Sequence, residues 1–314
     1  MNDSVYRERF GRYSATSLLL RGTSRLLRSS AAWLQRASEA LEFPRIVPSS
    51  LGCELLSRNS EFRDRHRGRR CFVIGTGPSL KRQDLEPLGG DVTFAANTFW
   101  KHPVVEVWQP TYYCVADPFF EKDSAEMDEF FRSLTSCIHS STFFVPLLGF
   151  QQNSERLPAD RTCYFDYCRT HPRFDDLDFT KPIPVFCNVA QLGIMLAIYM
   201  GCSPIYLLGL DHDWLAQQGS LSHFHAGYGG MEGDASRNST LESWKSYRFI
   251  MERLTQMWRF YEHLHDIARR KGLEIINVTD GGCLDVFLRA RYEDLISTDK
   301  SCAARESSVM SPAS

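Results

Sequence analysis

The stretch that decides the fold is Cys71-Phe72-Val73-Ile74-Gly75-Thr76-Gly77-Pro78-Ser79-Leu80. Its first four residues are apolar and partly β-branched, which predicts a buried strand of a parallel sheet. Two glycines follow, and Pro78 and Ser79 suit the first turn of a helix. A strand that ends in such a turn can present free backbone N–H groups and a positive dipole end to an anion. The alternative is an ordinary turn that uses glycine for a positive φ.

Strands and helices alternate after this stretch. We predict further strands over residues 92–97, 112–117, 142–147, 162–167, 205–210 and 273–278. We predict helices over residues 79–88, 119–139, 188–200, 241–271 and 283–289. Such alternation predicts an α/β fold of the Rossmann-like, doubly wound kind, with a mostly parallel sheet and helices on both faces.

The two ends of the chain differ from this middle part. Residues 1–60 are predicted as a basic extension whose segment 13–41 forms an amphipathic helix, with apolar residues interleaved with Arg21, Arg25, Arg28 and Arg36. Such a helix can lie on an anionic membrane surface or pack on a partner. Alternatively, it can pack on its own domain or be a mitochondrial-type presequence. The arginine-rich run 62–70 is predicted as a solvated linker. Residues 61–294 form the predicted Rossmann-like domain, and residues 295–314 a disordered tail.

Composition excludes several classes of protein. The net charge of −2 argues against nucleic acid as a main partner, because binding to a phosphate backbone needs a basic surface. The ten cysteines form no CxxC pair, we find no secretory leader, and several cysteines sit in apolar runs. We therefore expect reduced thiols and a cytoplasmic protein. No apolar run reaches the ~20 residues of a membrane span, so any contact with the inner membrane surface would be peripheral.

Polar residues gather where the predicted strands end, and ligands of open α/β sheets bind outside these carboxyl ends. Any single one could be a helix cap or a turn residue, and it is their coincidence at several strand ends that predicts a binding site. The candidate binding residues at these ends are Gly75, Thr76, Gly77, Ser79, Asn97 and Asp117, and Asn188 stands at the start of a predicted helix.

The segment after the strand 205–210 is the second informative stretch. It begins with Asp211-His212-Asp213 and later contains Ser222-His223-Phe224-His225. One interpretation makes a histidine the general base, since neutral imidazole can take a hydroxyl proton near neutral pH. A second is a metal site of His223, His225 and an aspartate, but no further His or Cys stands at a recognised ligand spacing. The third is a surface loop, and we predict no metal site.

The ordered set of these motifs resembles a known family. Gly75 to Leu80, Asn97, Ala116-Asp117-Pro118, Ile205 to Asp211, Ser222-His223-Phe224 and Glu274 to Thr279 resemble, in this order, the MptE-like family, named after an archaeal 6-hydroxymethylpterin diphosphokinase. The same framework is similar to bacterial lipooligosaccharide sialyltransferases and to motility accessory factors that glycosylate flagellin. The resemblance covers about residues 71–290.

The sialyltransferase-like members imply a nucleotide-sugar donor of the CMP-sugar kind. The resemblance would place the glycine turn and Asn97 beside the phosphate and ribose, Asp117 in place of a donor-binding asparagine, and His223 as the base. Two positions depart from that pattern: Thr76 replaces an asparagine, and Cys187-Asn188-Val189 replaces Thr-Ser-Gly. These departures argue against sialic acid as the transferred sugar and leave a nucleotide-linked donor.

The sequence thus predicts a glycosyltransferase of surface glycan or polysaccharide biosynthesis, with a glycan acceptor and with His223 and Asp211 as candidate catalytic residues. The alternative is a diphosphokinase that transfers diphosphate from ATP to 6-hydroxymethylpterin, with Asp117 and Asp211 binding Mg²⁺. Phosphoryl transfer relies on positioning and charge neutralisation and has no need of His223, which favours glycosyl transfer. A second alternative is a non-catalytic nucleotide-binding module.

Overall fold

The computed structural model describes residues 49–116, 124–168, 176–213 and 247–297. Its centre is an eight-stranded sheet in the order β10-β9-β8-β1-β2-β3-β4-β5, and all its strand pairs are parallel. The strands are β1 (Cys71–Ile74), β2 (Val92–Ala96), β3 (Tyr112–Cys114), β4 (Thr142–Pro146), β5 (Thr162–Phe165), β8 (Ile205–Leu208), β9 (Ile275–Asn277) and β10 (Leu288–Arg289). A separate parallel pair joins β6 (Tyr167–Cys168) and β7 (Ile183–Pro184).

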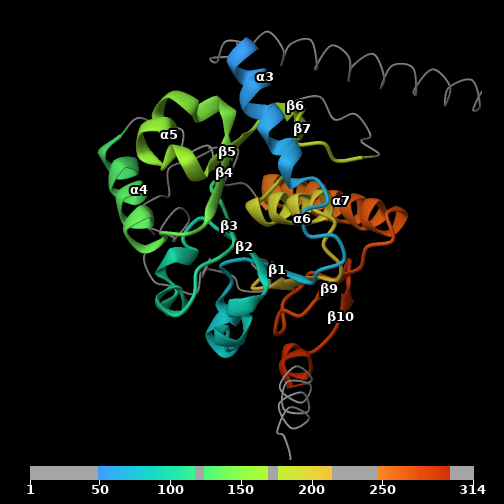
Figure 1. Cartoon of the computed structure of the whole chain (residues 1–314). Helices are drawn as coiled ribbons and strands as arrows, with labels where there is room; N and C mark the ends of the chain where they lie inside the picture. Colours follow the sequence, from blue (N-terminus) through green and yellow to red (C-terminus); the bar gives the residue numbers. More distant parts are fainter. Residues whose placement is uncertain (1–48, 117–123, 169–175, 214–246, 298–314) are drawn as a thin grey trace, which may run out of the picture.

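Helices cover both faces of the sheet, as predicted. In β1, Cys71 and Val73 face the core shared with α6 (Val189–Tyr199) and α7 (Tyr247–Arg270), while Phe72 and Ile74 face the opposite core. Figure 1 shows α6 and α7 on one side of the sheet and α4 and α5 on the other. The remaining helices are α3 (Ser49–Ser57), α4 (Ala125–Cys137), α5 (Phe150–Arg156) and the 3₁₀ helices η1 (Arg58–Phe62), η2 (Pro78–Arg82), η3 (Glu86–Gly90), η4 (Phe99–Lys101), η5 (Pro103–Glu106), η7 (Leu147–Gly149) and η8 (Ala159–Arg161).

The sheet reverses its direction of growth beside β1. The chain adds β2 to β5 on one side of β1, then returns to place β8, β9 and β10 on the other side. Ile74 pairs with Leu208 of β8, and Val73 pairs with Phe94 of β2. Open α/β sheets commonly bind ligands outside the carboxyl ends of their strands near such a switch point.

Most of the predicted elements are confirmed, with strands that end a few residues earlier. The helix over 188–200 is α6, which has Asn188 as its N-cap and is followed by Gly201 with a φ of +73°. The described part of the helix over 241–271 is α7, followed by Gly272 with a φ of +70°. The predicted helix over 119–139 is described from residue 124, and α4 begins at Ala125.

Two predicted helices are wrong. Over 79–88 the chain forms η2 and η3 instead of one helix, because Gln83 is extended between them and Pro87 has no N–H to donate within a continuous helix. Over 283–289 the chain forms no helix, and Leu288 and Arg289 pair with β9 as strand β10. Short apolar runs do not distinguish a helix from a strand by periodicity, which explains this second error.

The run 62–70 is not a solvated linker. Phe62 is buried and packs edge-on against Tyr112 and Phe144. The backbone N–H groups of Asp64, His66 and Gly68 donate to the carbonyls that end α6, at Tyr199, Met200 and Gly201. The arginine-rich composition predicted solvation, but the backbone is bonded to the domain, and Arg63 and Arg70 pair with Asp178 and Asp91.

Residues 49–59 also pack on the sheet. Leu55 and Leu56 of α3 are buried, and the Asn59 amide donates to the carbonyls of Tyr164 and Phe179.

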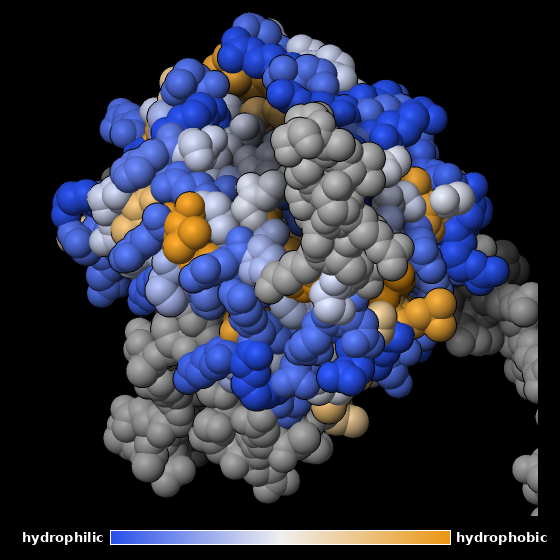
Figure 2. Space-filling view, turned by 60° about the horizontal axis from the view of Figure 1, so that its bottom comes forward, coloured by the Kyte–Doolittle hydropathy of each residue, from blue (hydrophilic) through white to orange (hydrophobic). Residues whose placement is uncertain are grey.

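The predicted amphipathic helix 13–41 lies outside the described residues, as does the tail from residue 298 onward. Among the described helices, none is long and apolar enough to cross a membrane. The face in Figure 2 is largely hydrophilic, and the large exposed apolar side chains of the described part are Val107, Met251 and Leu288.

Candidate functional site

The glycine turn after β1 is pressed against the loop that follows β8. A Cβ atom at Gly75 would lie 2.4 Å from the Gly209 oxygen, and one at Gly77 would lie 1.7 Å from Asp211 Oδ2. Two hydrogen bonds hold the loops together, from Gly75 N to Leu208 O at 2.8 Å and from Gly77 N to Gly209 O at 2.9 Å. Neither glycine is among the residues with positive φ. The turn therefore needs glycine for close approach of two backbones.

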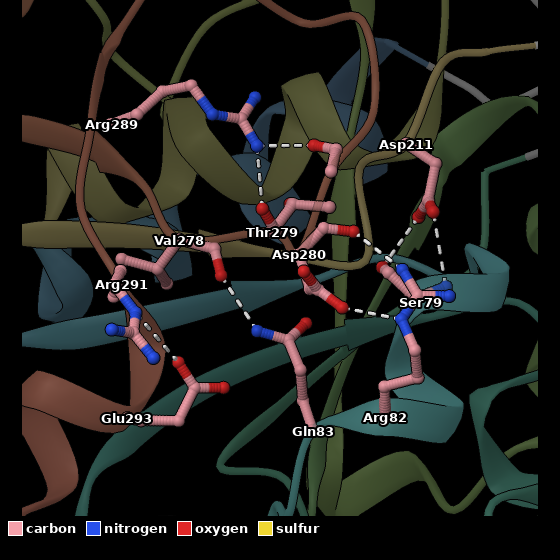
Figure 3. Close-up of polar contacts among 11 residues, drawn as sticks. Ser79, Arg82, Gln83, Asp211, Val278, Thr279, Asp280, Arg289, Arg291 and Glu293 are labelled. Atoms are coloured by element: carbon pink, nitrogen blue, oxygen red, sulfur yellow. Dashed lines mark hydrogen bonds and ion pairs between the residues drawn. The ribbon is translucent and has the colours of Figure 1, made fainter.

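Asp211 fixes the turn from the β8 side. Its carboxylate accepts from Ser79 N at 3.1 Å and from Ser79 Oγ at 2.8 Å, as Figure 3 shows. Burial raises the pKa of Asp211, and the hydrogen bonds from Ser79 oppose this shift. The amides of Gly75, Gly77 and Ser79 thus donate within the chain. The prediction that this turn presents free N–H groups to an anion is wrong for these three amides.

The loop after β9 packs on the same place. Cys283 N donates to Asp211 O at 2.7 Å, and a Cβ atom at Gly282 would lie 2.6 Å from that oxygen. Leu210 N donates to Thr279 Oγ1 at 3.2 Å. The loops after β1, β8 and β9 therefore pack together at one edge of the sheet, and a displacement of one loop would displace the other two.

Asn97 lies next to the glycine turn at the end of β2. The pairing of Val73 with Phe94 places Gly75 level with Ala96, so that Asn97 follows beside Thr76. Asn97 has a left-handed φ of +48°, donates from its backbone N–H to Cys114 O and accepts from the Tyr113 hydroxyl on its carbonyl. Its side-chain Oδ1 is buried and has no hydrogen-bond partner among the described residues.

Trp100 provides a second unsatisfied group near Asn97. Its backbone N–H donates to the Tyr113 hydroxyl at 2.9 Å, the same hydroxyl that donates to Asn97 O. Its indole Nε1 is buried and, within the described part of the chain, has no acceptor. Unsatisfied buried polar atoms are rare in native proteins, since each costs about 1–3 kcal/mol. Sequence analysis missed Trp100, because a single tryptophan after a strand has no distinctive signal.

The N-terminus of α6 lies at the same edge of the sheet, because α6 runs antiparallel to the strands before the chain enters β8. Asn188 Oδ1 accepts from Gln191 N at 3.1 Å and so caps the helix. Its Nδ2 donates to the Tyr261 hydroxyl at 3.0 Å, toward α7. The structure thus gives Asn188 a capping role, and the helix dipole directs positive potential at the edge.

His212 joins this network from the loop after β8. It has a left-handed φ of +47°, and its Nε2 lies 2.8 Å from the Tyr261 hydroxyl that also contacts Asn188. Burial lowers the pKa of His212 to about 4, so the ring is neutral at pH 7. Sequence analysis placed His212 at a strand end without giving it a role. The structure makes it the link between the β8 loop and α7.

The structure therefore brings Gly75, Thr76, Gly77, Ser79, Asn97, Asn188 and Asp211 to one edge of the sheet. Asp117, His223 and His225 lie outside the described residues. The described chain ends at this edge with Asp213 and resumes with α7, which precedes β9. In the described part of the chain, no group of three or more His, Cys, Asp or Glu side chains could hold a metal ion.

We expect the partly buried His212 to make the free energy of unfolding depend on pH. Its pKa is about 4 in the folded chain and 6.5 ordinarily, so the unfolded chain binds the proton more tightly. The free energy of unfolding then keeps its whole contribution from His212 above pH 6.5 and falls by about 3 kcal/mol as the pH is lowered from 6.5 to 4. Asparagine tolerates the left-handed φ, so His212→Asn should reduce this fall in urea unfolding midpoints measured across that range.

Burial also lowers the pKa of His66 and His102, so a smaller slope should remain in the variant. Parallel loss of stability in His212→Asn and the unmodified chain between pH 6.5 and 4 would show that His212 is accessible to protons in the folded state.

Comparison with known proteins gives a distant likeness in fold. No family model matches the chain, and no curated protein matches it in sequence. The glycosyltransferase MAf from Magnetospirillum magneticum AMB-1 is similar, with a TM-score of 0.42 and 13% identity over 90% of this chain, which spans 45% of that protein.

Solved structures of the sialyltransferase CstII from Campylobacter jejuni are also similar. The complex with CMP-3FNeuAc has a TM-score of 0.39 and 13% identity, and covers 70% of this chain and 86% of that one. The complex with a trisaccharide acceptor and CMP has a TM-score of 0.39 and 14% identity, and covers 70% and 85%. The function of the chain therefore has to be argued from its site.

Proposed function

We propose that this chain is a transferase that moves a sugar from a nucleotide-linked donor, of the CMP-sugar kind, to a hydroxyl of a glycan. The observation that carries the proposal is Asn97, whose buried amide oxygen has no partner among the described residues and whose backbone is held at a φ of +48°. Residues kept in sparsely populated backbone conformations gather at ligand sites. This one lies beside the glycine turn at the switch point of the sheet.

The chemistry of the unsatisfied atoms fits a nucleoside. The amide oxygen of Asn97 needs a hydrogen-bond donor, which ribose hydroxyls and base amino groups supply and an ionised phosphate does not. The indole N–H of Trp100 needs an acceptor, which a base or a ribose oxygen supplies. The two unsatisfied atoms therefore suit a ligand that carries both donors and acceptors, and the backbones of the two residues are joined through the Tyr113 hydroxyl.

The phosphate of the donor would lie toward the N-terminus of α6. The first N–H groups of a helix have no partner within the helix, and Asn188 caps that of Gln191. The positive dipole end stabilises negative charge there, which increases when the bond between the sugar and the phosphate breaks. Gly75, Gly77 and Ser79 would position the loops around the donor, and Thr76 and Asp117 would lie beside it.

We assign the proton transfer to His223. The acceptor hydroxyl oxygen attacks the anomeric carbon, the bond from that carbon to the phosphate oxygen breaks, and the nucleotide leaves with the electron pair. His223 takes the hydroxyl proton as general base. Asp211 acts on this reaction through the glycine turn, since both of its carboxylate oxygens are bonded to Ser79. The basic segment 13–41 would keep a cytoplasmic enzyme near membrane-linked acceptors of surface glycan biosynthesis.

Thermal unfolding in the presence of ligands tests the proposal. The purified chain is heated with a panel of nucleotide sugars, and binding to the folded state raises the midpoint. The proposal expects at least one nucleotide sugar to raise it. If none does, while ATP with Mg²⁺ and a pterin does, the chain is a diphosphokinase and the proposal is wrong.

We expect Asn97→Gly to weaken nucleotide binding about tenfold or more, because the ligand loses one buried hydrogen bond. Glycine accepts the φ of +48°, so the fold should keep its stability. Calorimetric titration with the best nucleotide of the panel measures the effect. Asp64→Gly is the matched control, since Asp64 also has a positive φ of 57° but lies away from this edge. Equal nucleotide affinity of the Asn97→Gly and Asp64→Gly variants would show that the Asn97 side chain does not bind the nucleotide.

A further inference from the structure

The hydroxyl of Tyr261 connects two parts of the candidate site. Tyr261 lies on α7 and is fully buried. Its oxygen is 3.0 Å from Asn188 Nδ2, at the N-terminus of α6, and 2.8 Å from His212 Nε2, in the loop after β8. Asn188 and His212 are both partly exposed. One buried hydroxyl therefore joins two side chains that reach the surface at this edge of the sheet.

The contacts of Asn188 fix the orientation of its amide. Its Oδ1 accepts from Gln191 N at 3.1 Å, so a flipped amide would set two donors against each other. Its Nδ2 then lies toward α7, where it contacts Met257 Sδ at 2.8 Å and the Tyr261 oxygen. The contact of Asn188 Oδ1 with the Tyr261 hydroxyl is longer, at 3.3 Å. Asn188 is therefore the donor in its bond to Tyr261.

The Tyr261 hydroxyl has one proton to donate. Burial raises the pKa of Tyr261, so this proton stays on the oxygen. Because the oxygen accepts from Asn188, its own proton is directed to His212 Nε2, the shortest of its contacts. Burial lowers the pKa of His212 to about 4, and the ring is neutral at pH 7. A neutral imidazole that accepts on Nε2 carries its proton on Nδ1.

We propose that Tyr261 is a positioning residue of the donor site, which holds Asn188 and His212 in place and keeps the imidazole proton of His212 on Nδ1. The inference rests on the proposed function, which places the phosphate of the donor at the N-terminus of α6. Tyr261 bonds both to this N-terminus and to the loop after β8, so it fixes their spacing. Since the lone pair of Nε2 is bonded to Tyr261, His212 cannot serve as the general base.

Nitrogen NMR of the full chain with isotope-labelled histidine tests the proton arrangement. Proton–nitrogen correlation spectra distinguish a protonated from an unprotonated ring nitrogen, and His212→Asn identifies the His212 signals by their loss. We expect a protonated Nδ1 and an unprotonated Nε2 at pH 7. Tyr261→Phe should give a mixture of both tautomers. Asn188→Ser should do the same, because serine still caps α6 but lacks the donor to Tyr261. A proton on Nε2 in the unmodified chain would overturn the inference.

Calorimetric titration with the best nucleotide of the panel tests the positioning role. Tyr261→Phe should weaken nucleotide binding about three- to tenfold, because α6 and the loop after β8 lose the hydroxyl that bonds to both. Tyr199→Phe is the matched control, since it removes a buried hydroxyl at the other end of α6 that donates to Asn59 O at 3.0 Å. This control should keep both the nucleotide affinity and the His212 signals of the unmodified chain.

The two measurements separate this inference from the proposed function. If Tyr261→Phe and Tyr199→Phe bind the nucleotide equally well, Tyr261 has no positioning role, while the donor site stands. If the unmodified chain binds no nucleotide but carries the His212 proton on Nδ1, the donor site is rejected and the positioning role with it. The proton arrangement alone is then confirmed.

Discussion

We expect Gly77→Ala to destabilise the domain by about 3 kcal/mol or more, which would lower the unfolding midpoint by about 10 °C. A Cβ atom at this position would lie 1.7 Å from Asp211 Oδ2 and 2.6 Å from Gly209 O. The carboxylate cannot swing away cheaply, because it is buried and both of its oxygens accept from Ser79. The backbone of one loop must therefore shift. Differential scanning calorimetry of the purified variant measures the midpoint.

Gly90→Ala is the matched control for this prediction. A Cβ atom at Gly90 meets nothing within 4 Å, and its φ is not positive, so we expect a change below about 0.5 kcal/mol. Gly77→Ala combined with Asp211→Ala should recover little stability, since the contact with the Gly209 oxygen stays. If Gly77→Ala unfolded at the same temperature as Gly90→Ala, the close packing of the loops after β1 and β8 would be wrong.

We expect His223→Ala to lower kcat about 10²–10⁴-fold while nucleotide binding is retained, because a general base contributes to the transition state and little to the ground state. The measurement follows release of the nucleotide from the nucleotide sugar that best stabilises the chain, in the presence of an acceptor glycan. A kcat that falls together with nucleotide affinity would instead give His223 a part in donor binding.

His225→Ala is the control, since it removes the other imidazole of the same segment. If His223 is the base, His225→Ala should keep most of the activity. Equal losses in both variants, together with inhibition by a chelator, would indicate a metal site of His223 and His225 and would contradict the assigned mechanism.

The architecture was largely predictable from the sequence because it depends on local patterns. Short apolar runs such as Cys71–Ile74 and Ile205–Leu208 are buried on both faces, and that pattern is typical of parallel strands. Asn188 and Gly201 fixed the bounds of α6 through capping chemistry. Errors arose where tertiary contacts decide, as in strand β10, which is only two residues long and depends on β9.

The position of the candidate site was predictable from the sequence, but the hydrogen bonds within it were not. The strand ends showed which residues meet at one edge, but not that Asp211 would occupy the N–H groups of the glycine turn. That contact joins residues 132 positions apart and has no local signal. The unsatisfied atoms of Asn97, Trp100 and Gln83 were likewise invisible in the sequence, because satisfaction of a polar atom depends on every neighbour in the fold.

The central claim is that the edge of the sheet at the β1–β8 switch point binds a nucleotide-linked sugar. A crystal structure of the chain soaked with CMP, or with the panel nucleotide that gives the largest shift, tests it most directly. The account predicts the nucleoside within hydrogen-bond distance of Asn97 Oδ1 and the phosphate at the N-terminus of α6. A nucleotide bound anywhere else, or an edge that stays empty when the ligand is saturating in solution, would contradict it.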